Sequence, residues 1–372
     1  MIQILDKHNC CGCNACVQKC PKQCISMHED EEGFLYPIVD FAKCIDCHLC
    51  EKICPCLNQE ESQEPLSCYA AKNTDEEIRK QSSSGGIFTA IAERVIAEGG
   101  VVFGACFDNN WQVFHTCVET KQGLATFRGS KYVQSQIGET FKQTESFLKE
   151  GRKILFSGTP CQISGLNHYL RKKYNNLLTI EVVCHGVPSP KIWREYLESL
   201  NLMNIGHISH KDKTSKHWRG YSFTIKNIAN KVIFTERAGD NKYLMAFVRN
   251  LTLRPSCFSC PAKAGKSRAD ITLADYWGIE HFVPEMDDNE GSSFICGNTQ
   301  KGEAFIKHLN IQMEQVDYQK SIYYNSCIFK SSNEPVERQQ FWSGYKCQGI
   351  KALLSLKSKK QNILKRVIKR LF

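Results

Sequence analysis

Apolar residues along the middle of the chain follow two alternating spacings, which predict strands and helices in turn. Within residues 86–99 they lie three or four positions apart, which predicts a helix that ends at Gly99-Gly100. Residues 101–107 are apolar almost throughout and predict a buried strand. We expect further elements downstream: a helix over about 139–150, a strand over 153–156, a helix containing Leu166, Tyr169 and Leu170, a strand over 177–183 and a helix that begins at Ser189-Pro190.

This alternation predicts an α/β domain with a mixed, largely parallel sheet. Two strand-like runs between residues 222 and 235 flank an Asn-rich turn, so we expect a hairpin to interrupt the alternation. Residues 58–67 are polar and acidic, and we interpret them as a solvated linker. The chain therefore divides into an N-terminal module over 1–57, the linker 58–67, an α/β domain over about 68–345 and a tail over 346–372.

The composition indicates a protein of the reducing cytoplasm. Of the 372 residues 21 are cysteine, and no N-terminal apolar segment resembles a secretory signal, so we expect the thiols to bind metals rather than form disulfides. No uncharged apolar stretch approaches the roughly 20 residues that span a bilayer. Residues 351–372 hold eight Lys or Arg and no acid, out of a net charge of +9. Because the rest of the chain is almost neutral, a general nucleic-acid-binding surface is not supported.

The tail alternates these cations with apolar residues at helical spacing. Such a basic amphipathic helix suits an anionic membrane surface, so we expect peripheral contact with the inner face of the membrane through residues 351–372. A helix that docks on a partner protein and a disordered end are the alternatives. The apolar positions are Leu353, Leu354, Leu356, Ile363, Leu364, Val367, Ile368, Leu371 and Phe372.

Two runs of cysteine near the N-terminus share the spacing C-x-x-C-x-x-C-x-x-x-C-P. This is the spacing of a bacterial two-cluster ferredoxin, in which three cysteines of a run hold one 4Fe-4S cluster and the fourth reaches the other cluster. Two zinc knuckles or a disulfide scaffold are the alternatives, but zinc sites usually need only two C-x-x-C pairs and here both quartets are complete. We therefore expect an α+β ferredoxin-like module with two clusters. The expected ligands are Cys10, Cys13, Cys16 and Cys54 for one cluster, and Cys44, Cys47, Cys50 and Cys20 for the other.

Four more cysteines lie at loops of the α/β domain, where such domains place their sites. Cys161 follows a strand-to-helix turn, Cys184 ends a strand, and Cys257 and Cys260 form a C-x-x-C pair. We interpret the four as ligands of a third 4Fe-4S cluster, with a structural zinc or a Cys257/Cys260 redox dithiol as the alternatives. Core packing is the default for the others: Cys11, Cys24, Cys56, Cys68, Cys106, Cys117, Cys296, Cys327 and Cys347.

Two loops contain residues suited to a phosphate-bearing cofactor. Ser82-Ser83-Ser84-Gly85-Gly86 precedes a helix whose N-terminal N–H groups can bind phosphate, although Ser is also an ordinary N-cap. Arg128-Gly129-Ser130-Lys131-Tyr132-Val133 offers two cations and an aromatic ring, which suit a pyrophosphate and a flavin or adenine ring as well as they suit a solvated loop. The sequence contains no GxGxxG or Walker A motif, so a Rossmann or P-loop nucleotide site is not indicated.

Five short motifs, taken in order, resemble the beta-subunit family of coenzyme F-420 (deazaflavin) hydrogenases and dehydrogenases. The motifs are Thr159-Pro160-Cys161-Gln162 with Gly165-Leu166, Val183-Cys184-His185-Gly186, Cys257-x-x-Cys260, Arg268-Ala269-Asp270-Ile271 and Asp275-Tyr276-Trp277-Gly278. The resemblance covers about residues 68–345, with a family N part over about 68–150 and a C part over about 151–345. This chain resembles the family's members from bacterial polysaccharide clusters. Reductases of chlorophyll derivatives also belong to the family, so the resemblance names no substrate.

The resemblance implies FAD and assigns roles to particular residues. It implies that Cys161, Cys184, Cys257 and Cys260 hold the cluster proximal to the flavin, and that Ser84, Gly85, Gly86, Lys131 and Tyr132 lie in the flavin-binding region. His185 is a candidate catalytic proton donor, or else a hydrogen-bond partner of a cluster sulfur. Asp275 is a candidate catalytic residue, or else a structural carboxylate paired with Arg268.

On this interpretation the chain is an iron–sulfur flavoprotein oxidoreductase. Single electrons from a ferredoxin-type donor pass through the clusters to FAD, which can deliver two of them to an organic acceptor. The alternatives are an electron-transfer subunit that serves a partner catalytic chain, and a redox-sensing or assembly protein.

Overall fold

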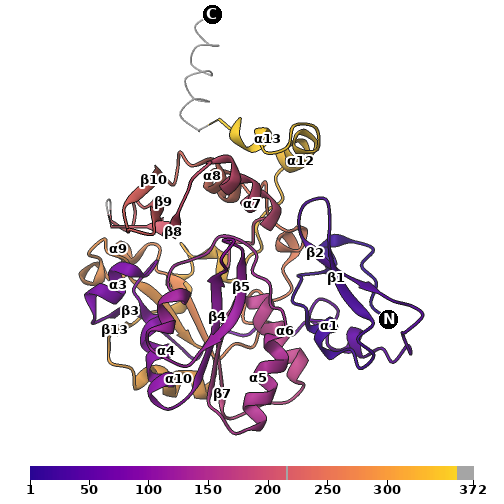
Figure 1. Ribbon diagram of the computed structural model, residues 1–372. Coiled ribbons are helices and arrows are strands. Elements are labelled where there is room, and N and C mark those ends of the chain that lie inside the picture. The colour runs from indigo at the N-terminus through magenta and orange to yellow at the C-terminus, as the bar shows by residue number, and fades with distance from the viewer. Residues whose placement is uncertain (215–216, 358–372) are drawn as a thin grey trace, which may run out of the picture.

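The computed structural model describes residues 1–214 and 217–357 (Figure 1). Its N-terminal module contains an antiparallel hairpin, β1 (Ile25–Glu29) and β2 (Leu35–Val39), and two short helices, α1 (Ala15–Lys19) and α2 (Leu49–Lys52). Each helix begins inside a cysteine run, directly after a residue with a left-handed backbone, Asn14 (φ 62°) or His48 (φ 56°). The duplicated cysteine spacing thus gives a duplicated local structure, and the predicted ferredoxin-like module is confirmed.

A mixed sheet of eight strands lies at the centre of the described part of the chain, in the order β13-β3-β12-β11-β7-β6-β4-β5. The four neighbours β11, β7, β6 and β4 run parallel, and the strands on either side of them pair antiparallel. The predicted α/β domain with a mixed sheet is therefore confirmed, with parallel pairing confined to the central strands. The strands are β3 (Ser67–Asn73), β4 (Val101–Phe107), β5 (Val113–Val118), β6 (Ile154–Gly158), β7 (Leu177–Val182), β11 (Ile271–Asp275), β12 (Ser293–Gly297) and β13 (Ile311–Gln315).

Helices cover both faces of this sheet. Phe103 and Phe156 lie in one buried cluster with side chains of α5 and α6, whereas their neighbours Val102 and Leu155 lie in a second cluster with side chains of α4 and α10. Successive side chains of a strand point to opposite faces, so central strands covered on both sides are apolar throughout. The helices of this domain are α3 (Glu76–Gln81), α4 (Ile87–Ala97), α5 (Thr140–Lys149), α6 (Pro160–Leu170), α9 (Ile279–Phe282), α10 (Gln300–Lys307) and α11 (Tyr318–Ser321).

A smaller lobe contacts the carboxyl ends of the central strands. The ring of Phe107, at the end of β4, lies 6.1 Å from that of Trp193 in the lobe, and Lys211 of the lobe reaches Asp275 at the end of β11. The lobe contains a second, antiparallel sheet, in which the predicted hairpin is β9–β10 and the third strand, β8, was not predicted. Its elements are α7 (Pro190–Ser199), β8 (Ile205–Asp212), β9 (Ser222–Asn227), β10 (Val232–Arg237), α8 (Lys242–Val248), α12 (Glu337–Gln348) and α13 (Lys351–Leu354).

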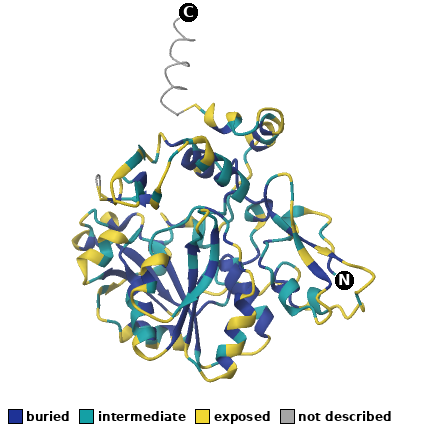
Figure 2. Cartoon of the chain, in the orientation of Figure 1, coloured by how far each residue is buried: buried dark blue, intermediate teal, exposed yellow. Residues whose placement is uncertain are grey.

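The N-terminal module packs beside α5 and α6 (Figure 1). Cys11 and Cys13 belong to the same hydrophobic cluster as Phe141 of α5 and Leu166 of α6. Figure 2 shows that this side of the module is buried, while its far side is exposed. At the closest approach Gly165 of α6 faces Cys13, and a Cβ placed on Gly165 would lie 2.7 Å from the Cys13 Cβ. The module and the α/β domain therefore share one core.

The C-terminal tail differs in part from its prediction. Residues 358–372 of the predicted amphipathic helix lie outside the described residues. Within the described part, α13 buries Leu353 completely in the core of the lobe, so this side chain does not belong to an exposed apolar stripe. Across residues 1–214 and 217–357, no helix has the length and apolar character needed to cross a membrane.

Candidate metal and cofactor sites

The cysteines of the two N-terminal runs surround two separate pockets. The first pocket is lined by Cys10, Cys13 and Cys16 of the first run and by Cys54 of the second, with Cys11 and Cys56 beside them. The second pocket is lined by Cys44, Cys47 and Cys50 of the second run and by Cys20 of the first, with Cys24 beside them. The structure thus brings these thiols together in the crossed grouping that the spacing predicts.

The surroundings of both pockets suit an iron–sulfur cluster. Backbone N–H groups approach the sulfurs of the second pocket, with Ile2 N lying 3.4 Å from Cys50 Sγ and Asp46 N lying 3.4 Å from Cys44 Sγ. Hydrogen bonds of this kind tune the potential of protein-bound clusters. In the described ranges no three His, Cys, Asp or Glu side chains are close enough to hold a single metal ion. Each quartet instead surrounds an open volume, and four thiols around such a volume fit a 4Fe-4S cluster.

The two pockets differ in their exposure to solvent. Cys13, Cys16 and Cys54 of the first pocket are buried, and this pocket adjoins the shared core. Cys47 of the second pocket is exposed, and Ile45 beside it is 57% exposed. The second pocket is therefore the one that faces the surroundings.

The four predicted cysteines of the α/β domain also converge. Cys161 is the second residue of α6, Cys184 follows β7 by two residues, and Cys257 and Cys260 lie in and directly after a 3-10 turn, η3 (Pro255–Ser259). Burial raises the pKa of Cys184, Cys257 and Cys260, and the nearby Cys161 thiol raises each of them further. Val187 N–H donates to Cys257 Sγ at 3.4 Å, as backbone N–H groups do in the second pocket. The set lies at the carboxyl ends of β6 and β7, where α/β domains place their sites.

A local hydrogen-bond network fixes the turn that carries Cys161. Thr159 is the N-cap of α6, and its N–H donates to Gln162 Oε1 at 2.9 Å, as in a capping box. Gln162 Nε2 donates to Ser135 Oγ at 2.8 Å, and Ser135 contacts the buried His115 Nδ1 at 3.0 Å. The motif Thr-Pro-Cys-Gln therefore specifies a rigid strand-to-helix turn, which positions the thiol.

Cys11 has a position that its spacing did not reveal. It is buried, as the core-packing prediction requires, but it also lines the first pocket and belongs to the hydrophobic cluster against which Cys161 packs. It therefore lies between the first pocket and the Cys161 set. The sequence could not predict this position of Cys11, because Cys11 comes near Cys161 only when the module packs against α6.

The two loops predicted to bind phosphate lie side by side. Ser130 N–H donates to Ser83 Oγ at 2.7 Å, which joins the loop before α4 to the loop that contains Lys131 and Tyr132. The Ser84 hydroxyl and the Gly85 N–H already donate to the edge of β12, to Ser292 O at 2.9 Å and Ser293 Oγ at 3.0 Å. Gly86 adopts φ 80° as the N-cap of α4. The closeness of the two loops agrees with one shared site, although these donors of Ser84 and Gly85 are already hydrogen-bonded within the protein.

Buried lysines supply positive charge at these loops. Lys131 Nζ donates to Arg128 O and Gly129 O, and burial lowers its pKa to about 8. Lys213, which sequence analysis missed, donates to Ser84 O at 2.9 Å, and burial lowers its pKa to about 8 as well. Both amines are cationic at neutral pH and approach the same pair of loops. An anionic group between these loops would meet two ammonium groups and the N-terminus of α4.

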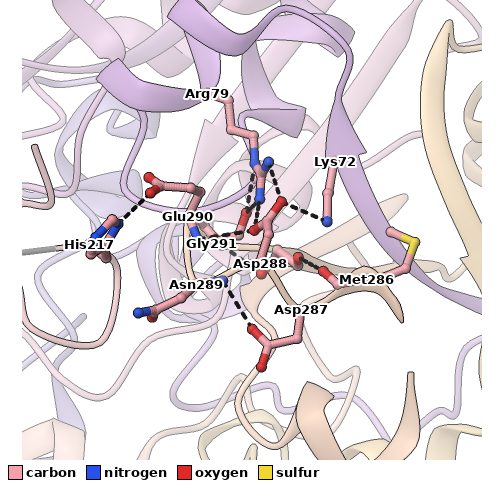
Figure 3. A network of polar contacts seen from close by, with 12 residues as sticks. Lys72, Arg79, His217, Met286, Asp287, Asp288, Asn289, Glu290 and Gly291 are labelled. Carbon is pink, nitrogen blue, oxygen red and sulfur yellow. Dashed lines mark hydrogen bonds and ion pairs between the residues drawn. The ribbon is translucent and has the colours of Figure 1, made fainter. Parts of the chain in front are cut away.

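A second network, drawn in Figure 3, holds the neighbouring 286–291 loop in place. Arg79 of α3 pairs with Asp288 and donates to Gly291 O, while Lys72 of β3 reaches the same carboxylate at 2.9 Å. Asp288 is partly buried, which opposes its charge, but the hydrogen bonds from Arg79 and Lys72 lower its pKa. Glu290 of this loop accepts from Lys213 through its backbone oxygen. The network thus fixes the lysine that approaches Ser84.

Asp275 pairs with Lys211 and not with Arg268. Lys211 Nζ lies 2.6 Å from Asp275 Oδ2 and within 4.8 to 5.5 Å of the ring centres of Trp218, Tyr221 and Trp277. The alternative pairing with Arg268 is wrong, because Arg268 precedes β11 and contacts Glu60 and Gln63 of the linker, whereas Asp275 ends that strand. Lys211 is a site residue that sequence analysis missed, since nothing in the pattern of β8 indicated which of its charges face the sheet.

His185 connects the Cys184 side of the site to Tyr132. Its Nε2 donates to Asn250 Oδ1 at 2.6 Å, an orientation fixed because Asn250 Nδ2 donates to Asn333 O. Burial lowers the pKa of His185, so the ring is neutral at pH 7. The ring meets Phe247 edge to face at 5.2 Å, and Phe247 stacks on Tyr132 at 4.8 Å. Burial raises the pKa of Tyr132, whose surroundings include Asp275. The predicted catalytic and flavin-binding residues are therefore contiguous.

Three family models match this chain. The model for the coenzyme F420 hydrogenase/dehydrogenase beta subunit N-terminus matches residues 68–142, and that for the C-terminus of the same subunit matches residues 151–320. A 4Fe-4S dicluster domain matches residues 9–58, so the N-terminal module is a 4Fe-4S-binding domain.

Individual relatives agree with these matches. The coenzyme F420 hydrogenase subunit beta of Methanosarcina barkeri is 30% identical over 105 residues, which are 27% of this chain and 35% of that relative. An uncharacterized protein of Methanocaldococcus jannaschii is 27% identical over 208 residues, 47% of this chain and 56% of its own length. The matched stretches thus span less than two thirds of either relative.

A solved structure shares the fold. A chain of the F420-reducing [NiFe] hydrogenase complex from Methanosarcina barkeri superposes with a TM-score of 0.50 at 18% identity, covering 79% of this chain and 97% of that one. The N-terminal and C-terminal family models together match more than half of the 372 residues, in the region where the motifs of the sequence predicted them. The chain belongs to the coenzyme F420 hydrogenase/dehydrogenase beta subunit family.

Proposed function

We propose that this protein is an iron–sulfur flavoprotein oxidoreductase that passes single electrons from a ferredoxin-type donor, through 4Fe-4S clusters, to FAD and an organic two-electron acceptor. The family match supports the coarser part of this proposal, an oxidoreductase subunit with a 4Fe-4S domain. The third cluster, the flavin and the acceptor go beyond that match and belong to the proposal.

One observation carries the proposal, namely the neighbouring side chains that run from the first pocket through the Cys161 set to the paired loops. Cys11 lines the first pocket and belongs to the hydrophobic cluster against which Cys161 packs, and His185 and Phe247 link the Cys184 side of that set to Tyr132. Electron transfer between buried centres requires such proximity. A redox sensor or an assembly protein has no need for a route that ends beside the paired loops.

The residues around Tyr132 fit a flavin with its pyrophosphate. Lys131 and Lys213 supply cations beside the N-terminus of α4, and Tyr132 and the 41% exposed Trp277 supply aromatic surface. FAD would store two electrons received one at a time and deliver them as a pair to the acceptor. Val182, at the carboxyl end of the central strand β7, is 43% exposed and leaves apolar surface uncovered where a ring could lie.

Exposure suggests where electrons enter. The second pocket, with Cys47 at the surface, suits contact with a ferredoxin-type protein, whereas the first pocket is enclosed by the shared core. Electrons that enter at the second pocket and pass through the first would therefore move inward toward Cys161.

Metal and flavin analysis of one anaerobic preparation tests this proposal. We expect about twelve iron atoms per chain, from three 4Fe-4S clusters, together with one FAD. About eight iron atoms and one zinc would show that the Cys161 set holds zinc and would remove the third cluster. Eight or twelve iron atoms without flavin would leave an iron–sulfur protein and overturn the flavoprotein assignment.

A second candidate is an electron-transfer subunit that serves a partner catalytic chain. It is favoured by the structural likeness to a chain of a multi-subunit hydrogenase complex. Turnover of an added organic acceptor by the isolated chain with dithionite as electron donor would exclude it. Reduction of the bound flavin without turnover would favour it over the first proposal.

A further inference from the structure

Arg254 is a buried arginine at the junction of the module and the α/β domain. It is the residue before η3, and only 1% of its surface is exposed. Its guanidinium donates to Cys10 O at 2.7 Å and Leu35 O at 2.9 Å in the module, and to Gln134 Oε1 at 3.0 Å in the α/β domain. All three acceptors are neutral, so the hydrogen bonds satisfy the donors without balancing the charge.

No carboxylate neutralises this cation in the described ranges. Arg254 forms no salt bridge there, and the ionisable groups that oppose the effect of burial on its pKa are the thiols of Cys10, Cys11 and Cys257 and the hydroxyl of Tyr36. Its Nη2 lies 3.6 Å from Cys10 Sγ, and its guanidinium lies over the Tyr36 ring at 4.2 Å. An isolated buried charge is costly, so a compensating negative charge is required nearby. Cysteine thiolates that hold a cluster supply that charge.

The two cysteine runs differ at the position that admits Arg254. Gly12, with φ 70°, lies between Cys10 and Cys13, and a Cβ at this residue would lie 2.9 Å from Arg254 Nη1. The corresponding residue of the second run is Asp46, whose side chain is 60% exposed and pairs with the N-terminal amine. The first run therefore receives a buried cation where the second run has an exposed acid.

We infer that Arg254 is the counter-charge of the first cluster and makes its reduction potential more positive than that of the second. This inference rests on the ligand sets of the proposed function. A one-electron reduction adds one negative charge to the cluster, and a buried cation near a ligand sulfur stabilises the reduced state more than the oxidised state. The cations beside the second pocket are the Met1 amine, which pairs with Asp46 and Glu51, and the exposed Lys22, so the difference favours electron flow from the second pocket to the first. Arg254 therefore acts only through its charge, on the potential of the first cluster, and does not contact the organic acceptor.

Redox titration of the anaerobic full-length protein, followed by electron paramagnetic resonance, tests this inference. The signal of the first cluster is identified by its loss in Cys16→Ser. We expect Arg254→Gln to lower the equilibrium constant for one-electron reduction of that cluster at least tenfold, which is about 59 mV on the potential scale. Arg254→Lys keeps the charge and retains most of the potential.

Arg338 provides a matched control. It is also a buried arginine that reaches the module, but it pairs with Glu32 and donates to Leu253 O at 3.0 Å. Arg338→Gln weakens the docking of the module without removing a charge next to a pocket, so the potential of the first cluster should stay unchanged. An equal shift in Arg338→Gln would mean that docking, and not charge, sets the potential, and would overturn the inference.

A second variant covers the case in which Arg254→Gln does not fold. Gln134→Glu leaves Arg254 in place and puts a carboxylate 3.0 Å from its Nη1, so it should also lower the potential of the first cluster. An unchanged potential in Gln134→Glu, together with Arg254→Gln if it folds, would refute a role for the charge. If Cys16→Ser removes no cluster signal, the ligand set itself is wrong, and the proposed function fails separately from this inference.

Discussion

Alanine at Gly165 tests how closely the module and α6 are packed. A Cβ at this position would lie 2.7 Å from Cys13 Cβ, 3.0 Å from Cys13 Sγ and 3.4 Å from Phe141 Cε2. Carbon atoms in contact normally lie about 3.5–4.0 Å apart, so the first of these distances is short by about 1 Å. Either α6 moves away from the module or Cys13 moves within the first pocket.

Two opposing terms decide the size of the effect. Replacing glycine by alanine inside a helix stabilises it by about 1 kcal/mol. Overpacking a core costs about 1–3 kcal/mol, and we expect the upper part of this range because Cys13, as a proposed cluster ligand, would yield little. The free energy of unfolding should therefore fall by up to about 2 kcal/mol in Gly165→Ala. Iron content should fall with it, since Cys13 lines the first pocket.

Gly344 in α12 is the matched control. A Cβ there meets no atom closer than Ala352 Cβ at 4.0 Å, so only the helix term applies and Gly344→Ala should gain about 1 kcal/mol. Anaerobic denaturation, with iron per chain measured on the same samples, compares the two variants. If both alanines stabilise the protein equally and retain full iron, the close approach of Gly165 to Cys13 is refuted.

Three further predictions concern the cofactor sites and the tail. Cys161→Ser should lower the iron content from about twelve to about eight atoms per chain, and an unchanged value by iron analysis would exclude Cys161 as a ligand. Burial lowers the pKa of Lys131 and of Lys213 to about 8, so both lose their charge as pH rises through that value, and the affinity for FAD should fall between pH 7 and 9. Flavin fluorescence titration measures this affinity; Lys213→Met should flatten the pH dependence, and a wild-type affinity that does not change with pH would contradict a phosphate site at these lysines. Deletion of residues 358–372, which keeps α13 and its buried Leu353, should shift the protein from the membrane to the soluble fraction, and an unchanged distribution on fractionation would remove the membrane proposal.

Strands β4, β6 and β7 could be predicted because each is buried on both faces and short loops separate it from its helices, whereas the fourth central strand, β11, was not predicted. The outer strands could not, because their pairing joins distant parts of the chain: Cys68 of β3 lies opposite Cys296 of β12. Half-polar strands such as β13, whose residues are mostly exposed, give little apolar signal.

The candidate site residues also include some that the sequence predicted and some that it did not. The N-terminal cysteines could be predicted because their spacing is local and repeated. Cys11 and Lys211 gained their positions only through the packing of separate parts of the chain, which no spacing records. The pairing of Asp275 with Arg268 failed because closeness in sequence does not place residues at opposite ends of a strand together.

The shared core has a consequence for how this protein matures. Cys11 and Cys13 are packed among Phe141 and Leu166, so the thiols that flank the first pocket are also part of what holds the α/β domain together. Metal binding that orders such residues contributes directly to the free energy of folding. We therefore expect chains made under iron limitation to have an incompletely packed core and to be degraded by proteases. Iron supply would then control the amount of folded protein as well as its activity.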